Sequence, residues 1–401
     1  MTVLRSNTRR LLLAAWIASG CTDGGGRGTS AAEGTGPDAG TTAGATSGTT
    51  IAATAGGDGT SGTTGGASQG GTGSSGSGGT QGADAGPEAC PSVPTCDGPP
   101  PDPGAAEPWR HVTNELVVAS GSPNHRIRDM FYLPGDPQWL IGKFTYGITD
   151  KDLKDEDVDV WVQRDCAGPW ELLGTATTTT DGQMPPVEGV EDTGGRVYFQ
   201  IPAAASLGLG RHRVHMVVKG DLSAVEGIVE VVGPGTPVFV TDVDGTLTTE
   251  ENEEFTALLT GQTPDAHPFA AEALSILAAK GYRPFYLTAR PEFLVERTRE
   301  FVSERGFPPG VIHTTTTLTG ATGDAAVLYK SDELFVLEGR DLLPRWAFGN
   351  TASDAEAYDV VGVEPLDARI FFQYSDTFGG RRIESYAELL DEFEQLPALC
   401  P

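Results

Sequence analysis

The chain has 401 residues, enough for two ordinary domains and additional segments. It holds 55 acidic and 27 basic residues, which give a net charge of −28 at pH 7. Such an acidic chain is not expected to bind nucleic acid, because clustered Lys and Arg bind a phosphate backbone. An anionic substrate would need a local positive group, such as a metal ion.

The first 21 residues resemble an export signal. A basic start precedes an apolar segment (11–20), which is too short to span a bilayer. The segment ends in Ala-Ser-Gly before Cys21, a sequence similar to a bacterial lipoprotein signal in which the cysteine is lipidated. This predicts a chain anchored to a membrane through Cys21, facing the periplasm or the cell surface. The alternative is an ordinary cleaved secretory peptide.

A long segment of low complexity follows the signal. Residues 22–89 are mostly Gly, Thr, Ser and Ala, and residues 90–108 are rich in Pro. Such a composition cannot bury enough apolar surface to offset the entropy lost on ordering. The sequence therefore predicts a disordered linker over residues 22–108.

Four cysteines remain after Cys21, and export favours their pairing into two disulfides. A Cys90–Cys96 bridge would close a short loop and leave Cys166 to pair with Cys400. Other pairings remain open at this point.

Residues 109–233 contain several short strand patterns separated by turn residues. The strand candidates are rich in Val, Ile, Phe and Tyr, which favour strands. They lie at 140–147, 158–162, 196–201, 211–218 and 226–232. This spacing predicts an all-β, immunoglobulin-like sandwich. The acidic run at 150–159 does not fit the known calcium loop, so we expect a solvated charged face there.

Residues 236–396 change to alternating strands and helices, after a Gly-Pro-Gly boundary. This rhythm predicts an α/β fold with a parallel, Rossmann-type sheet. Strands are expected from 238 onward and at 284–288, 311–314, 345–349 and 369–373. Helices are expected at 268–280, 291–305 and 324–338, and Ser385 and Glu388 form a capping box for a last helix.

Polar side chains follow three of these strands. Asp242 and Asp244 follow the first, Thr288 follows the second, and Asn350 and Asp354 follow the fourth. Because parallel strands place their carboxyl ends at one edge of a sheet, we expect these residues to share a pocket. Gly245 permits the turn that brings both early carboxylates to this edge. Lys330 lies upstream of the fourth strand, on or near a helix.

This order of motifs resembles the haloacid dehalogenase (HAD) superfamily. The closer resemblance is to lipin-type phosphatidate phosphatases and the related domain of phosphatidylinositol-transfer proteins. It covers residues 236–396 and rests on DVDGTLT (242–248), GYRPFYLTAR (281–290), Lys330 and WAFGNTASDAEAYDVVGV (346–363). The transfer-protein domain typically lacks the nucleophilic Asp, so Asp242 favours catalysis.

The resemblance implies phosphoryl transfer through an aspartyl-phosphate intermediate. Asp242 would be the nucleophile, and Asp244 would protonate the leaving group and then activate water. Thr288 would bind phosphoryl oxygens, and Lys330 would neutralise phosphate charge and hold Asp242. Asp354 would complete a Mg²⁺ site with Asp242 and the backbone carbonyl of Asp244.

Five more residues are predicted to bind substrate: Gly245, Thr246, Ala289, Arg290 and Asn350. Several of these assignments have simpler alternatives. Thr288 would be an ordinary strand-end threonine, Lys330 a surface lysine and Asp354 a helix cap. Arg290 would pair with Glu292.

The sequence thus predicts a Mg²⁺-dependent phosphomonoester hydrolase, with phosphatidate as the favoured substrate. One alternative is a phosphatase of soluble phosphoesters or phosphoproteins. Two others are a non-catalytic lipid- or protein-binding module and a cell-surface protein whose β-sandwich makes the contacts.

Overall fold

The structure is a computed structural model that describes residues 89–249 and 263–400. The predicted signal, Cys21 and all but the end of the linker predicted at 22–108 lie outside the described residues. Across the two described stretches, no helix is long and apolar enough to cross a membrane.

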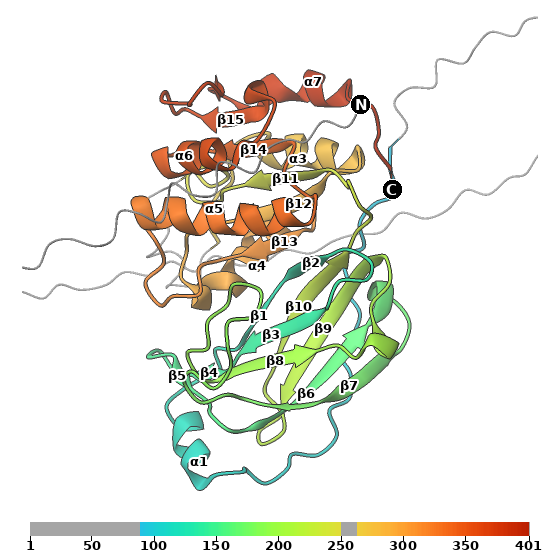
Figure 1. The fold of residues 1–401 in the computed structure, drawn as a ribbon, viewed down its shortest axis with the longest axis vertical. Coiled ribbons are helices and arrows are strands. Elements are labelled where there is room, and N and C mark those ends of the chain that lie inside the picture. The colour runs from blue at the N-terminus through green and yellow to red at the C-terminus, as the bar shows by residue number, and fades with distance from the viewer. Residues whose placement is uncertain (1–88, 250–262, 401) are drawn as a thin grey trace, which may run out of the picture. The chain divides into compact units, whose positions relative to one another are not determined.

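The amino-terminal part of the described chain forms a β-sandwich (Figure 1). The smaller sheet has the order β1-β3-β8, and the larger has the order β2-β10-β9-β6-β7. The strands are β1 (Arg126–Arg128), β2 (Met130–Tyr132), β3 (Trp139–Lys143), β6 (Asp157–Gln163), β7 (Trp170–Thr177), β8 (Arg196–Gln200), β9 (Gly210–Val218) and β10 (Ala224–Val231). Outside these sheets lie α1 (Val112–Val118), β4 (Thr145–Tyr146) and β5 (Lys151–Asp152).

Alternating side chains explain how β6, a strand of the larger sheet, faces the core between the two sheets. Val158, Val160 and Val162 are buried, while Asp157 and Asp159 on the other face are half-buried. The three valines pack into one core with residues of both sheets. The predicted β-sandwich is therefore confirmed.

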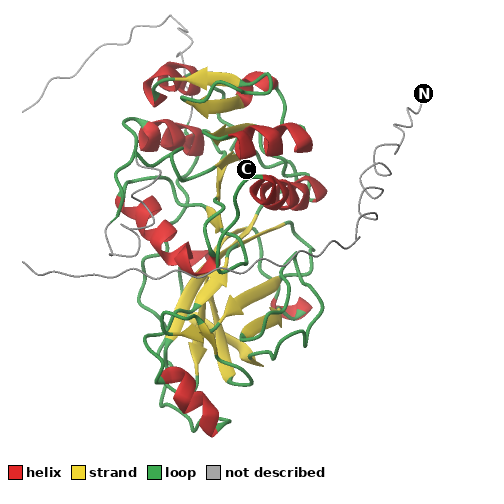
Figure 2. Ribbon diagram, turned by 90° about the vertical axis from the view of Figure 1, so that its left-hand side faces the viewer, coloured by secondary structure: helices red, strands yellow, loops and turns green. Residues whose placement is uncertain are grey.

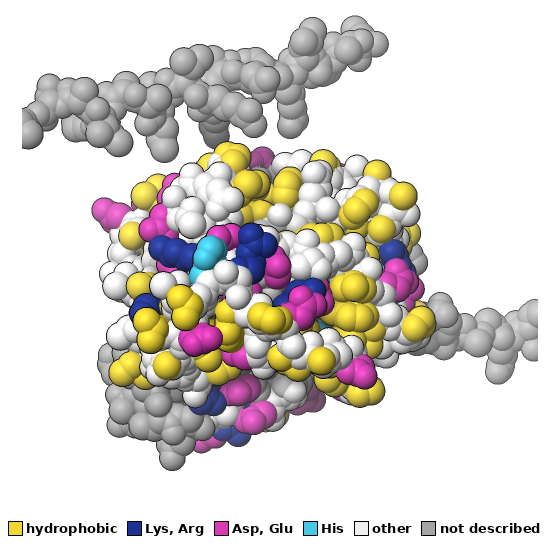
Figure 3. Space-filling view, turned by 90° about the horizontal axis from the view of Figure 1, so that it is seen from below, with side chains coloured by type: hydrophobic (Ala, Val, Ile, Leu, Met, Phe, Trp, Pro, Cys, Tyr) yellow, Lys and Arg dark blue, Asp and Glu magenta, His cyan; other side chains and the backbone are white. Residues whose placement is uncertain are grey.

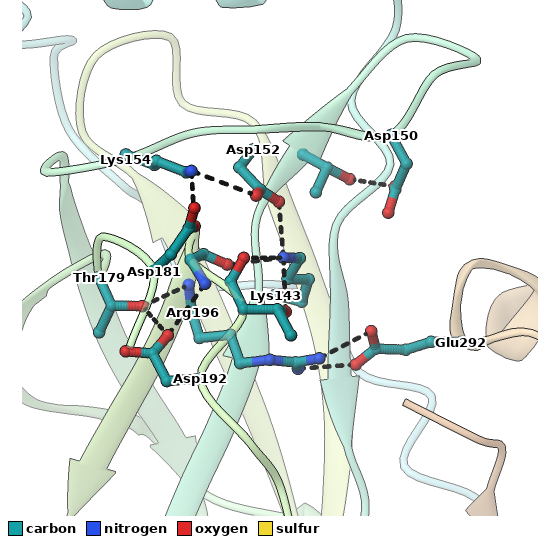
Figure 4. A network of polar contacts seen from close by, with 12 residues as sticks. Lys143, Asp150, Asp152, Lys154, Thr179, Asp181, Asp192, Arg196 and Glu292 are labelled. Carbon is teal, nitrogen blue, oxygen red and sulfur yellow. Dashed lines mark hydrogen bonds and ion pairs between the residues drawn. The ribbon is translucent and has the colours of Figure 1, made fainter. Parts of the chain in front are cut away.

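The acidic run at 150–159 is less solvated than its composition predicts. Asp150 bonds the buried Arg126. Asp152 contacts the buried Lys143 at 2.6 Å (Figure 4). The expectation of a solvated face is therefore wrong for these two residues, because both neutralise cations inside the sandwich.

The second part is a six-stranded sheet in which every neighbouring pair is parallel. Its order is β13-β12-β11-β14-β15-β16. The strands are β11 (Val238–Thr241), β12 (Arg283–Leu287), β13 (Val311–His313), β14 (Trp346–Gly349), β15 (Arg369–Phe372) and β16 (Arg381–Ile383). The strand order reverses between β11 and β14, the switch point where open α/β sheets bind ligands.

Helices cover both faces of this sheet (Figure 2). One face packs on α3 (Ala270–Ala279), α4 (Val295–Glu304) and α7 (Leu390–Glu394), and the other on α5 (Asp324–Gly339) and α6 (Ala352–Val361). Along β11, Phe239 enters the first core, while Val238 and Val240 enter the second. The strand is buried on both faces, which explains its apolar sequence.

Two elements differ from the sequence prediction. The helix expected at 291–305 begins as a 3₁₀ turn (Glu292–Leu294) and becomes α-helical only at Val295. The sheet also has a sixth strand, β16, whose short Arg-Arg-Ile sequence has no apolar run. The capping box at Ser385 and Glu388 is present and opens a 3₁₀ turn before α7.

The disulfides pair differently from the simplest expectation. Cys90 bonds Cys400, and Cys96 bonds Cys166. A Cys90–Cys96 bridge is therefore wrong, because residues 90–96 run between the two parts of the fold and not as a closed loop. Each end of this short segment is bonded to a different part.

Charged side chains of both signs lie next to one another on the surface seen in Figure 3. Exposed ion pairs of the described chain include Arg110 with Asp157 and Lys154 with Asp181. Such exposed pairs are screened by water and salt, so they contribute little to stability.

Candidate active site

The carboxyl ends of β11 and β14 place Asp242 beside the switch point. Its amide donates to the carbonyl of Phe348 at 3.0 Å, which continues the strand pairing by one residue. Gly245 then turns the chain with a φ of +69°, a region that favours glycine. The Gly245 amide donates to Oγ1 of Thr248 at 2.8 Å and closes this turn.

Lys330 joins two carboxylates inside this edge of the sheet. Its Nζ donates to Oδ1 of Asp242 at 2.7 Å and also to Oδ1 of Asp354. All three residues are buried, so Lys330 is not the surface lysine of the simpler alternative. The helix α5 carries Lys330 to the site from a position between β13 and β14 in the chain.

Burial and charge affect the protonation of this group in opposite directions. Burial raises the pKa of the Asp242 carboxyl to about 7, although Lys330 opposes this rise. Burial alone would lower the pKa of Lys330, but the carboxylates of Asp242 and Asp354 outweigh it and raise the pKa. Lys330 therefore remains a cation at neutral pH.

Asp354 is both a helix cap and a member of the site. Its Oδ2 accepts from the amides of Asn350 and Thr351 at 3.1 and 3.0 Å, at the start of α6. Its Oδ1 accepts from Lys330. The two alternatives for Asp354 are thus compatible, since capping fixes the carboxylate against the lysine.

Thr246 and Asn350 lie on the other side of Asp242. The hydroxyl of Thr246 is 3.1 Å from Oδ2 of Asp242 and 2.8 Å from Oδ1 of Asn350. One hydroxyl hydrogen can serve only one of these acceptors at a time. The hydroxyl of Tyr386 donates to the carbonyl of Thr246 at 2.8 Å and so helps to fix this turn.

Asp244 is held by two donors from the second strand end. Thr288 donates from Oγ1 to Oδ2 at 2.8 Å, and Arg290 donates from Nε to Oδ1 at 2.8 Å. The Asp244 side chain is 34% exposed, whereas Arg290 is buried. Arg290 does not pair with Glu292, so that simpler alternative is wrong; the carboxylate of Glu292 lies against the β-sandwich.

The polar segment HTTTTLTG (313–320), for which the sequence favours an ordinary loop over one that lines the site, supports these residues. Thr315 donates from Oγ1 to the carbonyl of Arg290 at 3.0 Å, and Ala321 donates its amide to the carbonyl of Ala289 at 2.9 Å. The run of threonines at 314–317 was the only signal, and an ordinary polar loop has the same composition.

The oxygen donors of this site fit a Mg²⁺ ion by their chemistry. Asp242 and Asp354 each have one carboxylate oxygen that accepts from Lys330, and a carboxylate oxygen has two acceptor positions. The amide oxygen of Asn350 lies beside them, and Mg²⁺ prefers such oxygen ligands. Within residues 89–249 and 263–400, however, no three His, Cys, Asp or Glu side chains are grouped to hold a metal.

A cavity with many lining residues lies away from this chemistry. It has a volume of about 800 Å³ and is lined by Pro237, Arg283 and Arg345, which lie at the amino-terminal ends of β11, β12 and β14. It is therefore at the opposite edge of the sheet from Asp242. In open α/β sheets the carboxyl-end edge is the ligand edge, so cavity size does not locate this site.

The chain matches two family profiles of the same group of proteins. Residues 239–372 match the LNS2 domain of PITM 1-3, and residues 123–188 match the PITM 1-3 β-sandwich domain. These matches support a HAD-like domain preceded by a β-sandwich, as the sequence predicted.

Curated relatives agree with these profiles. Membrane-associated phosphatidylinositol transfer protein 1 of Rattus norvegicus is 30% identical over 208 residues, and Protein retinal degeneration B of Drosophila melanogaster is 31% identical over 208 residues. Each match covers 51% of this chain but only 15% of the relative. A solved class C acid phosphatase from Bacillus anthracis is 18% identical, with a TM-score of 0.25 over 31% of this chain and 56% of that one; this likeness is too low to support a conclusion.

Proposed function

We propose that this chain is a phosphomonoester hydrolase in which Asp242 is the nucleophile. The single observation that supports this most is the buried array of Asp242, Lys330 and Asp354 at the switch point of the sheet. The LNS2 match is compatible with a phosphatase or with a lipid-binding module. Asp242 favours the phosphatase, since the related transfer-protein domain typically lacks a nucleophile there.

The proposed reaction has two steps. Oδ2 of Asp242 attacks phosphorus while the bond to the ester oxygen breaks, and Asp244 donates its proton to the departing oxygen. Water then attacks the aspartyl-phosphate, gives a proton to Asp244, and releases inorganic phosphate with Asp242 restored. Lys330 keeps Oδ1 fixed at 2.7 Å, which leaves Oδ2 directed for attack.

Asp244 must carry a proton to act as an acid, and Thr288 and Arg290 both donate hydrogen bonds to its side chain. Both donors are also the groups expected to bind phosphoryl oxygens. Transfer of these donors to a bound phosphate would weaken their hold on Asp244 and favour its protonation. Thr288 and Arg290 thereby couple phosphate binding to the proton that Asp244 must supply.

Mg²⁺ is part of this proposal. Asp242, Asp354 and the backbone carbonyl of Asp244 would hold it, with Asn350 as a neighbouring oxygen donor. When bound, Mg²⁺ would offset the repulsion between a carboxylate and a phosphate dianion. It would also supply local positive charge in a chain with a net charge of −28.

We propose phosphatidate as the substrate because residues 236–396 resemble lipin-type phosphatidate phosphatases. The names of the relatives, membrane-associated phosphatidylinositol transfer proteins, support a phospholipid ligand more generally. The same names favour a second candidate function, a non-catalytic module that binds a lipid phosphate. Both proposals use the same site. Release of phosphate distinguishes them, because only the hydrolase would turn over a substrate.

We also propose that the chain is an exported lipoprotein anchored to a membrane through Cys21, facing the periplasm or the cell surface. Two disulfides support export, because such bonds persist in oxidising compartments. We further propose that the β-sandwich is of the immunoglobulin-like type.

The test is turnover by the full chain, with Mg²⁺ and with a metal chelator. Phosphatidate vesicles and a small aryl phosphate serve as alternative substrates. We expect phosphate release that Asp242→Asn abolishes and that Asp367→Asn, a change at an exposed acid, leaves intact. Binding of phosphatidate without release of phosphate from either substrate would favour the non-catalytic module.

A further inference from the structure

Glu292 is held by the β-sandwich although it follows the second strand of the parallel sheet. Its carboxylate accepts from Nη1 and Nη2 of Arg196 at 2.8 and 3.0 Å (Figure 4). It also accepts from Nη2 of Arg126 at 3.1 Å. Both arginines are buried, and the Glu292 side chain is 13% exposed. This contact is a largely buried ion pair between the two parts of the fold.

The two arginines have fixed positions in the sandwich. Arg126 and Arg196 lie on β1 and β8, and both are in register with Lys143 on the strand between them. Three like charges on adjacent strands repel one another unless each is neutralised. Asp150 pairs with Arg126 and Asp152 with Lys143.

Arg196 depends on Glu292 for its neutralisation. In the described part of the chain, Glu292 is the only carboxylate in an ion pair with Arg196. A buried guanidinium without a carboxylate is unfavourable, so this side of the sandwich requires Glu292 in place.

Glu292 is also close to the site along the chain. Only Pro291 separates it from Arg290, whose guanidinium holds Asp244. The amide of Glu292 donates to the carbonyl of Thr317 at 3.1 Å, and Thr315 bonds the carbonyl of Arg290. This short segment is therefore bound at one end to the sandwich and at the other end to Asp244.

We propose that the β-sandwich sets the position of Arg290 in the site through Glu292. Glu292 is then a positioning residue: its carboxylate, clamped by Arg126 and Arg196, fixes the backbone from which Arg290 reaches Asp244. This inference rests on the proposed function for its effect on turnover. The expected effect of Glu292 on the backbone of residues 290–292 does not depend on turnover.

The test compares Glu292→Gln with Glu188→Gln in the full chain. Glu188 pairs with Arg340 at 2.7 Å, in another of the ion pairs between the sandwich and the helical part, and this pair does not contact the site. Its partners are also largely buried, at 15% and 16% exposure, which makes it a matched control.

The first measurement is hydrogen exchange at the amides of Glu292 (Gln in the variant), Thr315 and Ala321. We expect faster exchange there in Glu292→Gln and no change there in Glu188→Gln. The second measurement is the affinity for inorganic phosphate, together with kcat and KM. We expect Glu292→Gln to lower kcat by about 10- to 100-fold, with weaker phosphate binding.

Unchanged exchange in Glu292→Gln, or equal changes in both variants, would overturn the positioning role. Absence of turnover in the unmodified chain would contradict the proposed function only, because the exchange measurement would still decide the role of Glu292. Should Glu292→Gln fail to fold, Arg196→Lys is the alternative variant. It retains the positive charge but replaces the bidentate contact with Glu292 by a single hydrogen bond. The same pattern of exchange is then expected, with a smaller effect.

Discussion

Nζ of Lys330 lies 2.7 Å from Oδ1 of Asp242, although 88 residues separate them in the chain. Lys330 also contacts Asp354, which caps the helix after β14. One cation therefore links three elements that meet only because the sheet is parallel. Lys330 therefore affects both stability and chemistry, since it fixes the proposed nucleophile and is the cation shared by two buried acids.

Replacing Lys330 by Met should destabilise the fold strongly. The change leaves Asp242 and Asp354 buried without a cation, which costs about 3–5 kcal/mol when a buried pair loses one partner. Urea unfolding without added metal measures the loss. The double variant Lys330→Met with Asp354→Asn should recover part of it, because one of the two uncompensated charges is removed.

Lys280 provides the control for this prediction. It is equally buried, but its Nζ donates to the backbone carbonyl of Glu394 at 2.8 Å and faces no carboxylate in the described structure. Lys280→Met should cost only about 1 kcal/mol. Equal losses in the two Met variants would show that the carboxylates do not depend on Lys330.

Acid should weaken the contact between the β-sandwich and the parallel sheet. Burial would raise the pKa of Glu292, but Arg126 and Arg196 outweigh it and lower the pKa to about 2, from an ordinary value of 4.5. A lowered pKa in the folded state stabilises the protein above pH 4.5, and this contribution is lost as the pH falls toward 2. The shift corresponds to roughly 3 kcal/mol.

Unfolding free energies measured between pH 7 and pH 2 test this. Glu292→Gln should be less stable at pH 7 and should lose less stability on acidification than the unmodified chain. Other carboxyls also have lowered pKa values. Glu333 is one of them: Arg128 and His313 outweigh burial and lower its pKa to about 2, so part of the pH dependence should remain. Identical pH profiles for the two proteins would contradict the role of Glu292.

Much of this site follows from the order of residues along the chain. Strand ends in a parallel sheet must meet at one edge, so Asp242, Thr288 and Asp354 are close whatever their loops do. The order of residues along the chain does not predict that Arg290 pairs with Asp244. Glu292 is two residues away, but the turn after β12 directs the two side chains to opposite neighbours, Asp244 and the β-sandwich.

The pairing of the cysteines could not be predicted from the order of residues either. Cys90 and Cys96 are near in sequence, but their partners depend on where the two ends of the chain pass the folded parts. That information lies in the packing of the β-sandwich against the sheet, and no local pattern encodes it. The short strand β16 was missed for a related reason, since its pairing with β15 and not its sequence defines it.

The two disulfides should be found as Cys90–Cys400 and Cys96–Cys166. A digest made without reduction should contain peptides joined in this way, as mass spectrometry would show. The first bond joins residues 310 positions apart, so the Cys90→Ser/Cys400→Ser variant should lose about 2–5 kcal/mol of unfolding free energy. Peptides that join Cys90 to Cys96 would contradict this arrangement.

Gly349→Ala should damage the site through direct contact with Asp354. A Cβ at Gly349 would lie 2.3 Å from Cβ and 2.6 Å from Cγ of Asp354, so the acid would have to shift. The acid is buried and bonded to Lys330, so we expect a loss of about 1–3 kcal/mol and weaker phosphate binding. Thermal unfolding and calorimetry with inorganic phosphate measure the two effects.

Gly362 ends the same helix, α6, and separates this steric effect from damage to the helix. It has a φ of +78°, and a Cβ added there would meet no described atom within 4 Å, so Gly362→Ala strains only the backbone. That strain should cost about 1–2 kcal/mol and leave phosphate binding unchanged. Weaker binding in Gly362→Ala to the same extent as in Gly349→Ala would show that α6 as a whole, and not the placement of Asp354, sets the affinity.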